Sequence, residues 1–335
     1  MHFSTTALGA FVALTFSAPS FSATIVRPFE ASAQKYYQKL VAQEYDELDT
    51  AAAESRKSDL AISDGQSMLA AIYGGVAGCL SQGCSNRLTE AEWQQRLQLI
   101  SKWREKKPNS VVAEVAQAKF YLEHAYAIRG QGYANTVKQD AWQLFNQSIE
   151  TAYTLLNNAG PAAKQEPEWY ATMLNVGVAQ GWEVNKFNKI YAEAKRKSPF
   201  YQPVYFSASS YFSPRWHGSE LELKKFIDDV VKTTEKKIGK TMYARLNWSL
   251  WTETMFQDGQ TDWTQMKAGF ERMTADYPDP WNINNFAKFA CLAKDRQTVL
   301  KLADKIGDHP IDAAWWGSAK YYQQCVTDAR LSGHQ

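Results

Sequence analysis

Six consecutive residues form the turn that is richest in reactive side chains, Pro214-Arg215-Trp216-His217-Gly218-Ser219. Trp216 could stack on a sugar or a peptide, Arg215 could hold a carboxylate, and His217 could titrate near neutral pH. A structural role suits the same segment, because proline ends a helix, glycine permits the turn and the serine can cap the next helix. We favour the structural role and keep Arg215, Trp216 and His217 as candidate binding residues.

Groups that could act in catalysis do not form a recognisable pattern. Four histidines follow the N-terminal segment: His124, His217, His309 and His334. None lies in a nucleophile-elbow, zinc-protease or P-loop motif. The carboxylate pairs Glu90/Glu92 and Asp228/Asp229 point to different sides of a helix, which suits solvation better than glycoside hydrolysis. We predict no catalytic residue and no cofactor. An enzyme would need a site assembled from distant residues.

The four cysteines, Cys79, Cys84, Cys291 and Cys325, allow three disulfide connectivities. Cys79 and Cys84 enclose a short loop. Cys325 follows Cys291 by one repeat, on the terminal helix, so we predict that this second bond ties the last helix to the preceding repeat. A zinc site lacks a second close cysteine pair and a nearby histidine, so we predict no bound metal.

The N-terminal segment carries the pattern of an export signal. Residues 1–22 hold no Asp, Glu, Lys or Arg, and an apolar run gives way to small residues around Pro19 and Ser22. We predict cleavage after Ser22 and a periplasmic or secreted protein. A buried N-terminal helix is the alternative. No later segment is long and apolar enough to span a membrane.

Charge excludes one class of partner. The chain has 37 Lys and Arg against 35 Asp and Glu. A nucleic-acid binder usually carries a clustered basic excess, so we predict no nucleic-acid partner.

Helical periodicity predicts an all-α chain. Thr89-x-x-Glu92 is a capping box, and Trp93, Leu97 and Ile100 follow it at i, i+4, i+7 spacing. Further helices are expected from Val111 and from about Thr136 to Asn157. Strict two-residue alternation is missing, so a sheet has no obvious source.

The second half of the chain is modular. Aromatic-rich helices open near 167, 201, 240 and 280, and second helices follow at 186–197, 219–237, 262–276 and 296–306. The period of about 34 to 40 residues is typical of tetratricopeptide-like solenoids. We predict an α-solenoid of stacked helix pairs over residues 89–335, with a compact helical bundle as the alternative.

Residues 23–88 differ in character and are predicted to form an N-terminal helical extension that includes the short disulfide loop. Residues 34–48 read as one amphipathic helix. Residues 49–58 are small and polar, and the glycines of 74–78 suggest flexibility.

Residues 201–219, Tyr-rich and ending in Pro-Arg-Trp-His-Gly-Ser, suggest a family. With Asn285-Phe-Ala-Lys-Phe-Ala-Cys291, Asp295 and Trp315-Trp316, this segment resembles helical proteins described as "domain of unknown function 4034". The resemblance covers roughly 168–325 and departs at His217, where the family turn has glycine. It implies a helical-repeat fold and supplies no activity.

These observations predict a non-catalytic exported protein that binds a protein or peptide partner in the cell envelope. Exposed tryptophans on a concave repeat face would be the binding hot spots. Two alternatives stay open. One is an envelope glycan-binding or glycan-processing protein that uses exposed tryptophan, and the other is a protective inhibitor of a toxin or enzyme. Oligomeric state is not predicted.

Overall fold

The computed structural model describes residues 27–78, 88–130, 134–250 and 252–331. In these ranges the chain is helical, with one isolated bridge between Ala61 and Ser67 and no strand, which confirms the all-α prediction. The helices are α1 (Pro28–Val41), α2 (Tyr45–Ser58), α3 (Met68–Ala77), α4 (Glu90–Lys106), α5 (Val111–Arg129), α6 (Gln139–Asn158), α7 (Pro167–Ala179), α8 (Val184–Lys197), α9 (Gln202–Phe212), α10 (Glu220–Ile238), α11 (Thr241–Ser249), α12 (Trp263–Asp276), α13 (Pro280–Leu292), α14 (Arg296–Ile306) and α15 (Ala319–Leu331).

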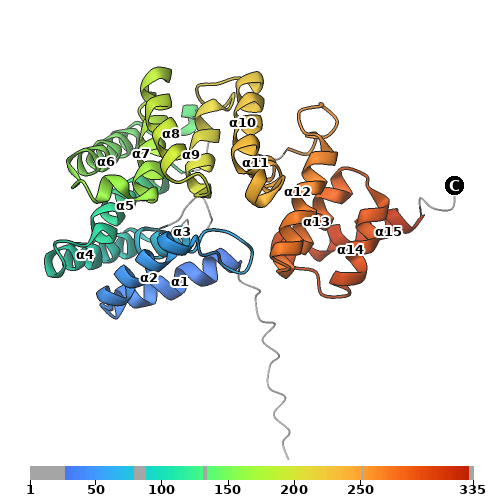
Figure 1. The fold of residues 1–335 in the computed structure, drawn as a ribbon, viewed down its shortest axis with the longest axis horizontal. Coiled ribbons are helices and arrows are strands. Elements are labelled where there is room, and N and C mark those ends of the chain that lie inside the picture. Colours follow the sequence, from blue (N-terminus) through green and yellow to red (C-terminus); the bar gives the residue numbers. More distant parts are fainter. Residues whose placement is uncertain (1–26, 79–87, 131–133, 251, 332–335) are drawn as a thin grey trace, which may run out of the picture.

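Neighbouring helices pack in pairs along an arc (Figure 1). Helices α5, α7, α9 and α11 contact one another in that order and form an inner row. Helices α6, α8, α10 and α12 pack against this row from outside, each beside its sequence neighbours. This arrangement is the solenoid-like stacking that the repeat period predicts.

The two kinds of helix differ in how they are buried. In α11 every residue from Thr241 to Asn247 is buried, because α9, α10 and α12 pack around it. Helix α8 buries only the stripe Phe187, Tyr191 and Ala194, at i, i+4, i+7 spacing, and its cationic residues lie outside that stripe. The aromatic-rich first helices of the sequence are therefore the inner row, and the amphipathic second helices are the outer one.

Local signals place most helix boundaries. Thr89 accepts from the Glu92 amide while the Glu92 side chain accepts from the Thr89 amide, so the capping box is present at the start of α4. The predicted second helices agree with α8, α10, α12 and α14 to within two residues.

The expectation for residues 34–58 is wrong. The chain forms two helices, α1 and α2, separated at residues 42–44, where Gln43 takes a left-handed conformation with φ 59°. Residues 74–77 belong to helix α3 rather than to a flexible stretch. The glycine has a packing role, because a Cβ at Gly75 would lie 2.3 Å from the carbonyl oxygen of Ala33 in α1. Gly75 thus lets α1 and α3 cross closely.

The loop of residues 59–67 ties the N-terminal helices to the second half of the chain. The carbonyl oxygen of Asp64 accepts hydrogen bonds from Arg245 Nη2 of α11 at 2.5 Å and from Asn282 Nδ2 of α13 at 3.0 Å. Gln202 of α9 donates to the carbonyl oxygen of Gly65 at 2.9 Å. Helices α9, α11 and α13 are thereby all held by this one loop.

A disulfide joins Cys291 of α13 to Cys325 of α15, with Cα atoms 6.1 Å apart. This confirms the predicted bond between the last helix and the preceding repeat. The predicted Cys79–Cys84 bond and the predicted signal peptide lie outside the described residues. Among the described helices, none combines the length and the apolar character that a membrane crossing requires.

Candidate functional site

The turn at 214–219 joins α9 to α10 and packs over the loop between α7 and α8. His217 Nε2 lies 3.1 Å from the carbonyl oxygen of Val178, and its ring lies 5.0 Å from the ring of Tyr211. A Cβ at Gly218 would come within 2.0 Å of the carbonyl oxygen of Phe212, so glycine is required there by close packing. These contacts give the turn the structural role that its sequence favours.

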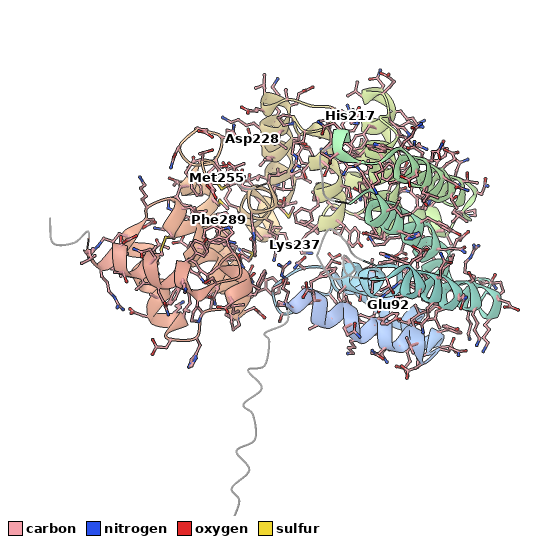
Figure 2. The ribbon with its side chains drawn as sticks, turned by 180° about the vertical axis from the view of Figure 1, so that it is seen from behind. Glu92, His217, Asp228, Lys237, Met255 and Phe289 are labelled. Carbon is pink, nitrogen blue, oxygen red and sulfur yellow. A yellow bond between two sulfur atoms is a disulfide. The ribbon has the colours of Figure 1, made fainter. Side chains whose placement is uncertain are left out.

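The candidate binding side chains of this turn are peripheral. Arg215 is exposed, and Trp216 is 38% exposed with Arg129 over its ring at 5.8 Å. Figure 2 places His217 at the outer edge of the molecule, far from Lys237, which lies near the middle. The three residues adjoin one another, but they do not line either of the two cavities described below.

The carboxylate pairs of the sequence have structural partners. Glu92 serves the capping box of α4, and Glu90 Oε2 lies 2.9 Å from His124 Nε2. Asp229 of α10 pairs with Lys195 of α8 at 2.7 Å, which joins two outer helices.

An acidic cavity lies where α3, α5, α7 and α9 meet, with a volume of 140 Å³. Its charged residues come from two inner helices: Lys119 and Glu123 lie one turn apart on α5, and Glu168 lies in the first turn of α7. Glu123 and Glu168 are only 6% and 2% exposed. Ionisable side chains are rarely buried so deeply unless they are paired.

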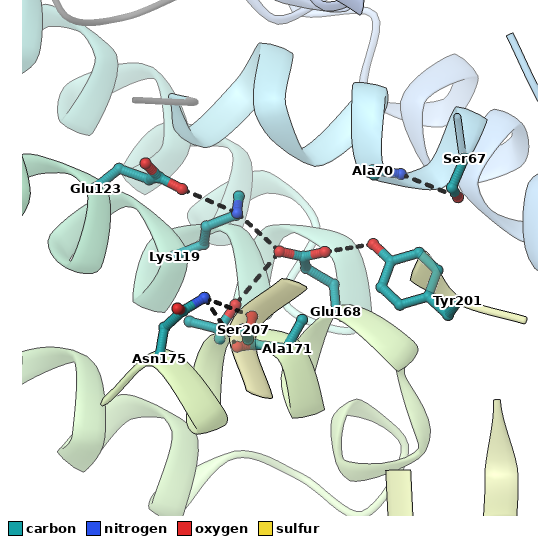
Figure 3. Close-up of polar contacts among 10 residues, drawn as sticks. Ser67, Ala70, Lys119, Glu123, Glu168, Ala171, Asn175, Tyr201 and Ser207 are labelled. Atoms are coloured by element: carbon teal, nitrogen blue, oxygen red, sulfur yellow. Dashed lines mark hydrogen bonds and ion pairs between the residues drawn. The ribbon is translucent and has the colours of Figure 1, made fainter. Parts of the chain in front are cut away.

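One lysine bridges the two carboxylates (Figure 3). Lys119 Nζ lies 3.0 Å from Glu123 Oε1 and 2.8 Å from Glu168 Oε1. The Tyr201 hydroxyl donates to Glu168 Oε2. Burial alone would lower the pKa of Lys119, but Glu168 and Glu123 outweigh it and raise that pKa above its ordinary value. The lysine is therefore a firm cation held between two carboxylates.

The remaining wall of the acidic cavity is polar. Asn175 Nδ2 of α7 donates to Ser207 Oγ of α9 at 2.7 Å. Gln202 uses its amide nitrogen on the 59–67 loop, while its buried Oε1 accepts no hydrogen bond from any described residue. Buried acceptors are rarely left unsatisfied, so this atom marks a place for a donor.

An aromatic cavity of 420 Å³ adjoins the acidic one. It is bordered by the start of α1, the 59–67 loop and helices α9, α11 and α13. The two cavities share four lining residues: Phe29, Gln66, Phe206 and Ser210. We call the pair the central groove. The aromatic cavity also has the tryptophans Trp248 and Trp281 in its wall, whose rings lie 6.3 Å apart.

Cations gather on the aromatic side. Arg27 lies over the Trp281 ring at 5.4 Å, and Arg245 lines the same wall with its Nη2 on the Asp64 carbonyl oxygen. Lys288, two turns after Trp281 on α13, lies outside the lining of the cavity. It is 6% exposed and has no carboxylate of a described residue within ion-pair distance. Burial, and to a lesser degree Arg27, lowers the pKa of Lys288 to about 8. The groove thus has an acidic end and a cationic, aromatic end.

Sequence reasoning missed these residues because they are far apart in the chain. The available signal was a pair of charged residues in an apolar helix. Lys119 and Glu123 stand at i, i+4 spacing in a helix that is otherwise apolar on most faces. Such a pair in an inner helix needs a partner from another element, here Glu168. Comparison of the chain with protein-family models, curated proteins and solved structures finds no match.

Proposed function

We propose that this chain is a non-catalytic, exported binding protein that holds an extended peptide segment of a partner in the central groove. The contiguous groove, lined by carboxylates at one end and by arginines and tryptophans at the other, is the observation that carries this proposal. An extended peptide presents ammonium, amide and carboxylate groups in a row. The groove offers carboxylates at one end, polar side chains between, and arginines with tryptophans at the other.

The supporting geometry is that of an inner solenoid surface. Helices α7 and α9 present polar side chains to the groove, namely the half-buried Asn175 and the buried Ser207 and Ser209. Repeat proteins commonly bind partners on such surfaces. Trp248 and Trp281 supply the rigid aromatic area that dominates binding energy at interfaces.

Site-specific photo-cross-linking in cells that make the protein tests the proposal. A benzoylphenylalanine at Phe206, which lines both cavities, should yield a covalent adduct with a partner. The same group at Leu144, 51% exposed on α6, serves as the outer-face control.

Two matched variants decide whether the adduct forms in the groove. Ser210→Arg fills the rim shared by the two cavities, whereas Ser101→Arg places the same side chain on an exposed position of α4. We expect Ser210→Arg alone to abolish the adduct. No adduct from position 206 above the Leu144 background, or an adduct that Ser210→Arg leaves intact, would refute groove binding.

The tryptophans favour a second candidate, an envelope glycan. Trp248 and Trp281 could stack on sugar rings, and Arg27 could hold an acidic sugar. Quenching of tryptophan fluorescence by oligosaccharides, lost in Ser210→Arg, would support it. The inhibitor role would instead appear as one tight protein partner recovered in the cross-linking experiment. The resemblance to the family described as domain of unknown function 4034 stays a prediction.

A further inference from the structure

We propose that the aromatic cavity binds a carboxylate, which Arg245 holds and which the carboxyl terminus or an acidic side chain of the bound segment supplies. The proposal rests on the peptide-binding function proposed above and names the group that the aromatic end of the central groove recognises.

A buried arginine with an unused donor is the first ground. Arg245 lines the cavity and is 5% exposed. Its Nη2 donates to the Asp64 carbonyl oxygen, whereas its buried Nε donates to no described residue. Asn282 donates to the same carbonyl oxygen, but its own Oδ1 has no hydrogen-bond partner and so does not serve this Nε. Because buried donors are rarely left unsatisfied, the Nε marks a place for an acceptor.

The charge of Arg245 is only partly compensated by the protein. No carboxylate of a described residue forms an ion pair with it. The Asp64 carboxylate instead accepts from Gln66, from the backbone amide at 2.9 Å and from Nε2 at 2.7 Å. Burial lowers the pKa of Arg245, and the negative charge of Asp64 offsets this only in part. A ligand carboxylate would pair with the guanidinium directly, in the planar geometry that the two groups share.

Further donors in the same wall are the second ground. The indole N–H groups of Trp248 and Trp281 donate to no described residue, and neither nitrogen is fully buried. Arg27 lies over the Trp281 ring and forms an ion pair with Glu30 at 3.9 Å. That pair is partly exposed and therefore weak, so the Arg27 guanidinium keeps donors for a ligand. An ionised carboxylate only accepts hydrogen bonds, which matches a wall with several N–H donors that lack an acceptor.

Size and access are the third ground. A volume of 420 Å³ is typical of small-molecule pockets, so the cavity admits a carboxylate together with the side chain beside it. The tryptophan rings and Phe29 offer apolar surface to that side chain. Phe206 and Ser210 connect this cavity to the acidic one, toward which the rest of a peptide would extend. We therefore expect a carboxylate next to an aromatic side chain to bind best.

Isothermal titration of the full chain with N-acetylphenylalanine tests the site without assuming a longer peptide. This probe joins a carboxylate to an aromatic ring, and N-acetylphenylalanine amide is the matched neutral probe of nearly the same size. We expect saturable binding of the carboxylate, at least about tenfold tighter than binding of the amide, because ion-paired hydrogen bonds are stronger than neutral ones. Equal affinity for the two probes, or no binding of either, would overturn the proposal.

Arg245→Lys tests whether this arginine recognises the carboxylate. Lysine keeps a positive charge and a donor for the Asp64 carbonyl oxygen but lacks the Nε–H and the planar fork. We expect the preference for the carboxylate over the amide to fall by about fivefold or more. Arg196→Lys makes the same change at an exposed position of α8 and should leave the preference as in the parent. An unchanged preference in Arg245→Lys would refute the assignment to Arg245.

Ser249→Trp locates the bound carboxylate even if Arg245→Lys fails to fold. Ser249 is exposed and lines the aromatic cavity but not the acidic one, so a tryptophan there should fill the cavity and abolish binding of N-acetylphenylalanine. The control Ser101→Trp adds the same side chain to an exposed position of α4 and should bind like the parent. Parent-like affinity in Ser249→Trp would place the carboxylate elsewhere and overturn the proposal.

Three acetylated pentapeptides, each with one phenylalanine, identify the source of the carboxylate. One has a free carboxyl terminus and no acidic residue, one is amidated with a central glutamate, and one is amidated with a central glutamine. Tighter binding of the first than of the third indicates a terminus, and tighter binding of the second indicates a side chain. Measurable but equal binding of all three contradicts the proposal.

Two further outcomes separate this proposal from the peptide function. Binding of N-acetylphenylalanine without binding of any pentapeptide would support the carboxylate site and count against the peptide function. A cross-linked adduct at Phe206 without a preference for the carboxylate probe would support the peptide function and overturn the carboxylate site. Tighter binding of glucuronate than of N-acetylphenylalanine would assign the site to an acidic sugar and overturn the peptide source.

Discussion

The sharpest stability prediction concerns Lys288. Its charge is buried, and no carboxylate of a described residue lies within ion-pair distance of it. The variant Lys288→Met keeps about the same side-chain volume and removes the charge. The pKa of Lys288 is lowered from 10.5 to about 8, first by burial and then by Arg27. Between about pH 8 and pH 10.5 the unfolded chain therefore holds a proton that the folded chain has released. Stability must rise with pH across that interval.

The size of the effect follows from the same shift. Below pH 8 the folded parent carries the buried charge of Lys288. The lowered pKa corresponds to a destabilisation of the folded state by at most about 3 kcal/mol there. Methionine loses the contact of the ammonium with the Trp316 ring, 5.4 Å away, which offsets about 1 kcal/mol. We expect Lys288→Met to be more stable than the parent by about 2 kcal/mol at neutral pH. The gain should vanish above about pH 10.5, where Lys288 is uncharged in both the folded and the unfolded parent.

Urea unfolding of parent and variant at several pH values between about 6 and 11 provides the measurement. The control is Lys301→Met, which removes an exposed lysine from the neighbouring helix α14 and should change stability by less than about 0.5 kcal/mol at any pH. A Lys288→Met variant that is less stable than the parent at neutral pH would show that Lys288 has a stabilising partner. A gain that does not depend on pH would assign the effect to packing.

Three further predictions concern the disulfide of the last helix, the N-terminus of α14 and the loop of residues 59–67. Cys291→Ser should lower stability by about 4 kcal/mol, because its bond spans 34 residues, and this loss should exceed that of Cys79→Ser by between about 1 and 2 kcal/mol. Limited proteolysis of Cys291→Ser should then cut from about residue 312 onward. A C-terminal helix as protected as in the parent would contradict this. Burial opposes the charge of Asp295, but hydrogen bonds from Lys267, Thr298 and Trp263 outweigh it and lower the pKa. The ionised carboxylate therefore stabilises the fold fully above about pH 4, and this stabilisation is lost as the pH falls. Asp295→Asn should remove about 1 to 2 kcal/mol of stability at neutral pH and little in acid, as measured by thermal unfolding at both pH values. Arg245→Met should cost about 1.5 to 3 kcal/mol and speed hydrogen exchange in residues 59–67, and unchanged exchange there would refute the role of that loop.

Helix boundaries could be predicted from sequence because their causes are local. The Thr89 capping box, the prolines that begin α7 and α13, and the apolar stripe of α8 act within one helix. Pairing of helices followed from the repeat period. The Cys291–Cys325 bond followed as well, since a separation of 34 residues equals one repeat.

The groove could not be predicted in this way because its contacts are not local. Arg245 and Asn282 reach the Asp64 carbonyl oxygen from 181 and 218 residues away. The error at residues 42–44 has a similar origin. The apolar pattern continues across residues 42–44 and predicted one helix. The structure has α1 and α2 separated there, and both pack against α3, with Gly75 at the α1–α3 crossing. Tertiary packing overrode the local pattern.

The buried charge of Lys288 is costly in the protein without a ligand. Its ammonium lies near Arg27, and no carboxylate of a described residue lies within ion-pair distance of it. Well-packed apolar residues at such positions are often more stable than buried charges. A ligand with a carboxylate at this end of the groove would relieve part of that cost. Binding should therefore stabilise the fold through this charge as well as through buried apolar area, and this contribution should weaken when Lys288 is neutralised.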